Sequence, residues 1–173
     1  MSGSIVLLSG PPGAGKTTIA RELLACSPGP LSYIEGDKFW PFTAKRAEGE
    51  TLPQSFSLVM SSMTAAAIPY ARKGYEVILD FSIPPWFLDA VRKITAGKDI
   101  SLDYVVLRPS EPVCAARAAS REEGAMPDYT LYHNLYTSFD AAVGNMISDD
   151  ISDAAVIAGR IREGLDAGIF RIS

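Results

Sequence analysis

The feature that most constrains this chain is a glycine-rich segment close to the N-terminus. It reads Gly10-Pro11-Pro12-Gly13-Ala14-Gly15-Lys16-Thr17 and satisfies the pattern G-x-x-x-x-G-K-[ST] at every fixed position. The short apolar run Ile5-Val6-Leu7-Leu8 comes before it, and a helical pattern over Thr17–Ala25 follows it at once. A buried strand, a glycine turn and a helix in this order are the context that a phosphate-binding loop requires. The segment therefore predicts such a loop and an α/β fold around it.

Each residue type in the segment has a chemical role. Gly13 and Gly15 allow backbone dihedral angles and a close approach to a ligand that a β-carbon would prevent. The N–H groups of the loop can converge on phosphate oxygens, assisted by the positive end of the next helix. Lys16 offers a flexible positive charge to the β- and γ-phosphates, and Thr17 offers a hydroxyl to Mg²⁺. We therefore expect ATP and Mg²⁺ to bind here, through Gly10, Pro11, Pro12, Gly13, Ala14, Gly15, Lys16, Thr17 and Thr18.

Further apolar runs extend the prediction along the chain. Glu76–Leu79 and Tyr104–Leu107 have the pattern of strands buried on both faces, Leu31–Ile34 is a weaker example, and Asn145–Ile147 the weakest. Helices are expected between them, over Gln54–Lys73, Phe87–Ala96, Glu111–Glu123 and Asp153–Ala167. Strands that alternate with helices predict right-handed crossovers and a three-layer α/β sandwich. At 173 residues, the chain is expected to form a single domain over residues 1–173.

Composition narrows the classes of partner. The formal net charge is −4, which disfavours nucleic acid as the main partner because phosphate backbones select basic surfaces. No apolar run approaches the ~20 residues that span a bilayer, and the first residues lack the basic region of a secretory signal. Two cysteines, Cys26 and Cys114, suggest neither a disulfide framework nor a metal site. We therefore expect a cytoplasmic protein without a membrane or nucleic-acid partner; the oligomeric state stays open.

Two carboxylates follow predicted strands and are candidate site residues. Asp80 ends the run Val77-Ile78-Leu79, where it could hold a magnesium-bound water or contact the substrate, or else cap the next turn. Asp37 follows the Leu31–Ile34 strand, so it should lie at the carboxyl edge of the sheet, where ligands bind. There it could accept the proton of an attacking hydroxyl group, or it could simply occupy a turn beside Gly36.

Two arginines are candidates for contact with the transferred phosphate. Arg117 and Arg121 are four residues apart, hence on one face of a helix. Planar guanidinium groups stabilise the charge that spreads over phosphoryl oxygens in the transition state. Arg121 also precedes a flexible segment, Gly124–Tyr129, that we expect to act as a lid. The alternative is a solvated helix face with Arg121 paired to a neighbouring glutamate.

The chain resembles the small-molecule P-loop kinases, the group of gluconate kinases, shikimate kinases and chloramphenicol phosphotransferases. The D-G-D-x-x-H-P segment of gluconate kinases corresponds to Glu35-Gly36-Asp37-Lys38-Phe39-Trp40-Pro41, and their G-E-x-L element corresponds to Gly49-Glu50-Thr51-Leu52. The arginine pair before the lid corresponds to Arg117 and Arg121. The resemblance implies a nucleoside-monophosphate-kinase-like fold with a five-stranded parallel sheet, a short mobile lid and Mg²⁺ dependence.

The departures from the gluconate kinase pattern fall on the acceptor side. Glu35 stands where that family has aspartate, Trp40 where it has histidine, and Asp80 ends a strand that does not normally end in aspartate. Nucleoside monophosphate kinases are also similar, but their T-G-D-x-x-R segment carries a phosphate-gripping arginine at the position of Trp40. The resemblance therefore predicts γ-phosphate transfer from ATP to a hydroxyl of a small molecule.

Other functions remain open at this point. They are a nucleoside or nucleoside monophosphate kinase, and a non-metabolic ATP-binding protein of toxin-like or regulatory type. A GTPase switch is disfavoured because the chain has no N-K-x-D segment, and a ring-forming ATPase would need a longer chain with a second domain.

Overall fold

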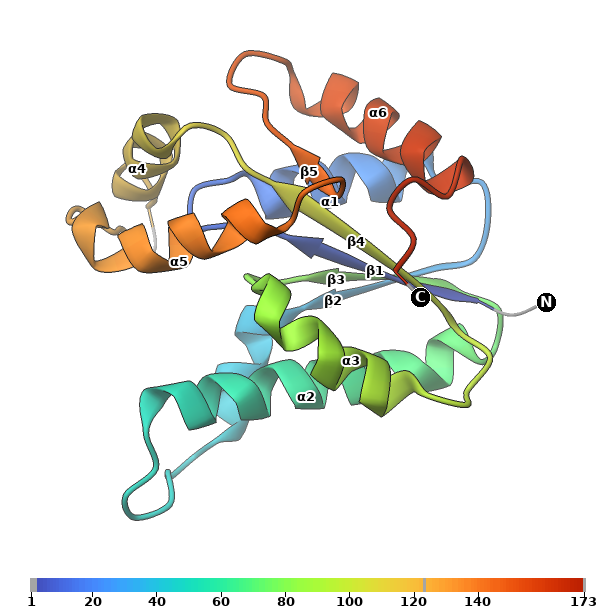
Figure 1. The fold of residues 1–173 in the computed structure, drawn as a ribbon, viewed down its shortest axis with the longest axis horizontal. Coiled ribbons are helices and arrows are strands. Elements are labelled where there is room, and N and C mark those ends of the chain that lie inside the picture. The colour runs from blue at the N-terminus through green and yellow to red at the C-terminus, as the bar shows by residue number, and fades with distance from the viewer. Residues whose placement is uncertain (1–2, 123, 173) are drawn as a thin grey trace.

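A computed structural model describes residues 3–122 and 124–172. Five strands form one parallel sheet in the order β2-β3-β1-β4-β5 (Figure 1). The strands are β1 (Ser4–Ser9), β2 (Leu31–Glu35), β3 (Glu76–Asp80), β4 (Ser101–Leu107) and β5 (Met146–Ile147). The α-helices are α1 (Lys16–Cys26), α2 (Leu52–Ala71), α3 (Leu88–Thr95), α4 (Glu111–Ala119), α5 (His133–Ser138) and α6 (Ala154–Asp166).

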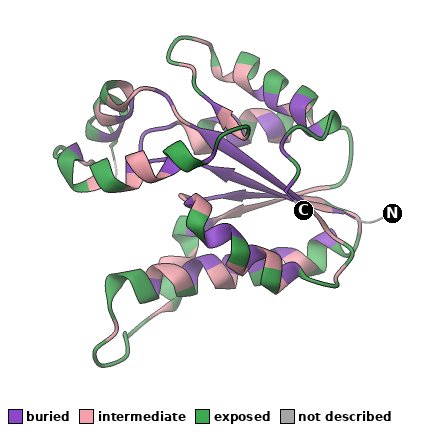
Figure 2. Cartoon of the chain, in the orientation of Figure 1, coloured by how far each residue is buried: buried purple, intermediate pink, exposed green. Residues whose placement is uncertain are grey.

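Helices cover both faces of the sheet, which makes three layers (Figure 1). The central strand β1 alternates between two cores: Ile5 and Leu7 pack with α2 and α3, whereas Val6 and Leu8 pack with α1 and α6. All four of these side chains are fully buried, as the purple strands of Figure 2 illustrate. The predicted three-layer sandwich with a five-stranded parallel sheet is therefore confirmed.

The predicted helices all form, but some of their ends differ, and several short helices were not predicted. Helix α4 ends at Ala119, earlier than the predicted end at Glu123, which lies outside the described residues. Helix α2 begins and ends two residues earlier than predicted, and it contains Pro69 because a proline so close to the end removes only one hydrogen bond from the last turns. Helix α5 and the 3₁₀ helix η1 (Gly36–Phe42) were not expected, since they are short and carry no clear period.

The carboxyl ends of β1, β2, β3 and β4 meet at one edge of the sheet. Parallel register places Leu8 opposite Asp80 and Val105, and Glu35 opposite Asp80. The segments that follow these strands therefore converge on the start of α1. Within residues 3–122 and 124–172, no helix combines the length and apolar character needed to cross a bilayer.

Candidate active site

The glycine-rich loop joins β1 to α1 and is packed closely against β4 and α4. Gly13 has φ 79° and Gly15 has φ 90°, so both adopt left-handed backbone conformations that favour glycine. A β-carbon on Gly13 would lie 2.0 Å from the carbonyl oxygen of Cys114, in α4. A β-carbon on Gly15 would meet no atom within 4 Å, so this glycine borders open space at the start of the helix.

Lys16 places its ammonium group inside the loop. Its Nζ donates hydrogen bonds to the carbonyl oxygens of Gly10 and Pro11, both at 3.1 Å, and to the hydroxyl of Ser82 at 3.2 Å. Burial lowers the pKa of Lys16 because it removes water from the charged form, and the nearby carboxylate of Asp80 opposes this effect. A desolvated cation of this kind interacts strongly with a phosphate anion.

Thr17 and Asp80 lie side by side at the first turn of α1. The Thr17 hydroxyl donates to Oδ2 of Asp80 at 2.7 Å, and the Tyr33 hydroxyl donates to the same oxygen at 2.9 Å. Asp80 is 4% exposed, so its carboxylate needs these donors. Because the Thr17 hydroxyl donates its hydrogen to Asp80 in this bond, its oxygen lone pairs stay available for a cation.

The residues fit Mg²⁺. This hard cation is usually held in nucleotide sites by one or two protein oxygens together with phosphate oxygens, not by a full protein cage. Thr17 and Asp80 supply oxygen donors of that kind beside the loop. The part of the chain that the structure describes contains no cluster of three or more His, Cys, Asp or Glu side chains suited to a metal.

Asp37 lies in η1, directly after β2. Its side chain is exposed, and its charge acts to raise the pKa of Lys16, so the two charges lie close enough to interact. Gly36 lets η1 approach the ring of Phe81, because a β-carbon there would lie 2.5 Å from the ring. Trp40 and Phe56 pack around the same ring, with centroids 6.4 and 5.2 Å from that of Phe81. An aromatic cluster therefore supports the segment that carries Asp37.

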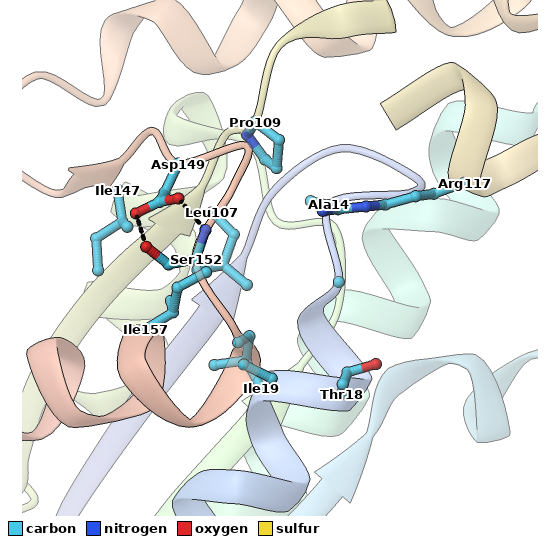
Figure 3. Close-up of a pocket in the computed structure, with 12 residues that line it drawn as sticks. Ala14, Thr18, Ile19, Leu107, Pro109, Arg117, Ile147, Asp149, Ser152 and Ile157 are labelled. Carbon is cyan, nitrogen blue, oxygen red and sulfur yellow. Dashed lines mark hydrogen bonds between the residues drawn. The ribbon is translucent and has the colours of Figure 1, made fainter. Parts of the chain in front are cut away.

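A cavity of about 200 Å³ opens on the other side of the loop (Figure 3). Its apolar wall includes Leu107, Ile147 and Ile157, and Ala14 and Gly15 connect it to the loop. Arg117 extends from α4 toward Ala14 at its edge (Figure 3). A compact, mostly apolar cavity next to a phosphate loop has the form of a site for a flat base. No periodic pattern in the sequence predicts this cavity, because its residues come from five separate segments.

Asp149 stabilises the turn on the far wall of this cavity. Its carboxylate accepts hydrogen bonds from the backbone N–H groups of Ile151 and Ser152, from the Ser152 hydroxyl, and from Arg160 at 2.7 Å. These donors hold the pKa of Asp149 well below its usual range, because they all favour the charged form. The hydrogen bonds of Asp149 therefore fix the turn that lines this side of the cavity.

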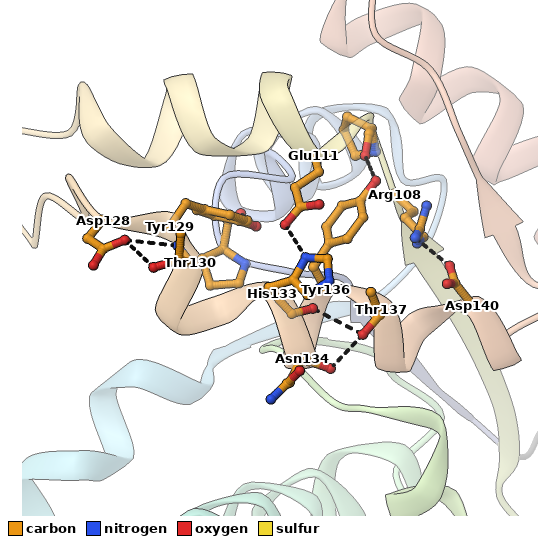
Figure 4. A network of polar contacts seen from close by, with 12 residues as sticks. Arg108, Glu111, Asp128, Tyr129, Thr130, His133, Asn134, Tyr136, Thr137 and Asp140 are labelled. Carbon is orange, nitrogen blue, oxygen red and sulfur yellow. Dashed lines mark hydrogen bonds and ion pairs between the residues drawn. The ribbon is translucent and has the colours of Figure 1, made fainter.

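The expected lid segment, Gly124–Tyr129, is anchored at two points. The Tyr129 hydroxyl donates to the carbonyl oxygen of Pro12 at 2.8 Å, and the N–H of Met126 donates to Ala118 at 3.0 Å. Figure 4 shows Tyr129 beside the pair formed by His133 and Glu111, 2.8 Å apart, which joins α5 to α4. Arg121, which precedes this segment, is exposed, and its charge lowers the pKa of Lys16.

The predicted site residues thus fall into two groups. Thr17 and Asp80 are hydrogen-bonded to each other, and Asp80, Asp37 and Arg121 act on Lys16 through their charges. Arg117 lies apart from them, at the cavity edge. Sequence reasoning missed Ser82, Tyr33 and Tyr129. Ser82 could have been found, because it follows a strand that ends at the same sheet edge.

A parallel sheet with a glycine loop, a buried lysine and a hydroxyl–carboxylate pair at the first turn of α1 defines a P-loop nucleotide-binding protein. The family described as AAA domain matches residues 5–131, which is most of the chain. The chain therefore belongs to the AAA domain family. None of the curated protein sequences matches it.

Solved structures with the same fold include several small kinases. A sugar kinase from Janibacter sp. HTCC2649 is 21% identical, with 95% of each chain covered and a TM-score of 0.71. The APS kinase of Mycobacterium tuberculosis, in complex with AMPPNP and APS, is 18% identical, with 95% of this chain and 98% of that chain covered and a TM-score of 0.68. A gluconokinase from Sinorhizobium meliloti 1021 is 23% identical, with 96% and 97% covered and a TM-score of 0.60. The fold is that of small-molecule P-loop kinases, as the resemblance in sequence predicted.

Proposed function

We propose that this protein is an ATP-dependent phosphotransferase that moves the γ-phosphate of ATP to a hydroxyl group of a small molecule. The observation that carries the proposal is the grouping of Lys16, Thr17 and Asp80 at the start of α1, with Thr17 and Asp80 2.7 Å apart. A cation, a hydroxyl with free lone pairs and a carboxylate at one point are the groups that position a nucleotide phosphate chain. The family and the fold of the similar kinases support the same reading.

Each side chain has a distinct part in this function. Lys16 would exchange its carbonyl partners for the β- and γ-phosphate oxygens, and the exposed Arg121 would add positive charge beside them. Thr17 and Asp80 would hold Mg²⁺, which neutralises charge on the phosphates when bound. The adenine base of ATP would occupy the cavity beside Leu107. Tyr129 keeps the loop in place through its bond to Pro12.

Asp37 would address the acceptor. It lies at the ligand edge of the sheet, and a carboxylate there can accept the proton that the attacking hydroxyl loses. Trp40 packs into the aromatic cluster around Phe81. The η1 segment contains no arginine that could bind a monophosphate. The acceptor class that fits best is a hydroxylated molecule, neutral or acidic, and not a nucleoside monophosphate.

The test is a screen of hydroxylated acceptors with labelled ATP, using wild-type protein and the variant Asp37→Asn. The variant keeps the size of the side chain and removes its charge, so transfer should fall by ~10²–10⁴ if Asp37 is the general base. Asp166→Asn, at the C-terminal end of α6, is the matched control and should leave transfer unchanged. Efficient phosphorylation of CMP, UMP or AMP at a rate that Asp37→Asn does not change would refute both the acceptor class and the role of Asp37.

A further inference from the structure

Two hydroxyl groups from different elements meet at a single oxygen of Asp80. Thr17 in α1 reaches Oδ2 at 2.7 Å, and Tyr33 in β2 reaches the same atom at 2.9 Å. Tyr33 lies in an edge strand, opposite Ile78 of β3, and is not part of the glycine loop. The edge strand β2 therefore contributes the Tyr33 hydroxyl group to the site.

The two donors restrict the orientation of the carboxylate. A carboxylate can turn about its Cβ–Cγ bond, and the terminal torsion of aspartate is broad and roughly two-fold. Two donors that approach Oδ2 from separate elements oppose this rotation, because turning the group breaks both bonds at once. With Thr17 as the sole donor, the hydroxyl could follow the carboxylate as it turns. Its lone pairs would then no longer point in one direction.

The surroundings of Tyr33 keep its hydroxyl a donor. The ionised carboxylate of Asp80 can only accept hydrogen bonds, so the phenol must donate in this contact. The ring packs against the apolar core between the sheet and α1, where Leu31 also lies. Replacement by phenylalanine would therefore keep the packing and remove only the hydrogen bond.

We propose that Tyr33 is a positioning residue for Mg²⁺: it holds Asp80 in the orientation in which the Thr17 hydroxyl directs its lone pairs at the metal. This inference rests on the proposed function, because it concerns the metal side of the same nucleotide site. Outer partners of metal ligands orient those ligands, and their loss typically weakens metal affinity by ~10–100-fold. Tyr33 acts through Asp80 and Thr17 without itself contacting the substrate.

The experiment uses Mn²⁺ as a paramagnetic probe, titrated into the protein with a saturating non-hydrolysable ATP analogue and followed by electron paramagnetic resonance. Tyr33→Phe should weaken Mn²⁺ binding by ~10-fold or more while the metal-free affinity for the analogue stays unchanged. The matched control is Tyr75→Phe, which removes the hydroxyl of a tyrosine that lies just before the amino end of β3, away from the carboxyl edge of the sheet, and should bind Mn²⁺ like the wild type.

A double-mutant cycle tests whether Tyr33 works through Asp80. In an Asp80→Asn background, Tyr33→Phe should have little further effect on Mn²⁺ affinity. Equal Mn²⁺ affinities of wild type and Tyr33→Phe, an undiminished effect in the Asp80→Asn background, or loss of folding in Tyr33→Phe would each overturn the proposal. Absence of any binding of the analogue to the wild-type protein would instead overturn the proposed function, and this inference with it.

Discussion

Replacement of Gly13 by alanine should destabilise the protein more than the same change at Gly15. Both glycines have positive φ, so alanine at either position costs ~1–2 kcal/mol in backbone strain. Only at Gly13 does the new β-carbon collide with another atom, the Cys114 carbonyl oxygen at 2.0 Å. That oxygen belongs to the backbone of α4, so the loop or the helix must move.

The difference between the two variants isolates the collision. Overpacking of this kind costs typically ~1–3 kcal/mol. For a chain of this size, each kcal/mol lowers Tm by roughly 2–4 °C, so Gly13→Ala should melt roughly 2–12 °C below Gly15→Ala. Gly15→Ala should weaken ATP binding, and its loss of stability should not exceed the backbone strain, because the new β-carbon points into open space beside the loop.

Thermal denaturation followed by circular dichroism gives the two Tm values, and isothermal titration with ATP gives the affinities. Equal melting temperatures for Gly13→Ala and Gly15→Ala would refute the close packing of the loop against α4. A Gly15→Ala protein that binds ATP like the wild type would refute the view that the phosphates of ATP occupy the open space beside Gly15.

Two further predictions follow from the site. Arg121→Ala should lower kcat more than it weakens ATP binding, because the charge that Arg121 meets is largest in the transition state. Arg117→Ala should mainly weaken ATP binding, because Arg117 lies at the edge of the cavity. Steady-state kinetics and ATP-binding measurements on the two variants would contradict the account if both lost kcat alone or both lost ATP affinity alone. Asp149→Asn should lower Tm at pH 7. Its low pKa in the folded state means that the charged carboxylate adds stability at pH values above the unfolded-state pKa of ~3.9, and that this contribution is lost as pH falls below it. The gap in Tm between wild type and Asp149→Asn should therefore narrow in melting curves taken from pH 7 down to pH 3, and a constant gap would argue against the charge of Asp149 as its source.

Much of the fold could be predicted because its strands are short, continuous apolar runs. Val6 and Ile78 are apolar neighbours in a sheet buried on both faces, the arrangement for which continuous apolar runs of this length are typical. The loop was equally clear, since its glycines and Lys16 are adjacent in the sequence. Helix α5 was missed because six residues are too few to establish a helical period.

The rest of the site depends on contacts between distant residues. Tyr33 and Asp80 are 47 positions apart, and Tyr129 and Pro12 are 117 apart, so no local pattern links them. Tyrosine is common in strands for packing reasons alone, and its hydroxyl carries no positional signal. The cavity beside Leu107 likewise forms only when β4, β5 and α1 come together.

The most direct test of the central claim is a single-turnover measurement of γ-phosphate transfer from labelled ATP to the best acceptor found by the screen, with wild type and Lys16→Ala compared. Lys16 donates to loop carbonyls and to Ser82, outside the apolar core, so Lys16→Ala should fold normally. Its transfer rate should fall by at least ~10²-fold, the typical loss when one preorganised stabilising group is removed. Transfer at the wild-type rate by Lys16→Ala would contradict the assignment of this loop as the site of phosphoryl transfer.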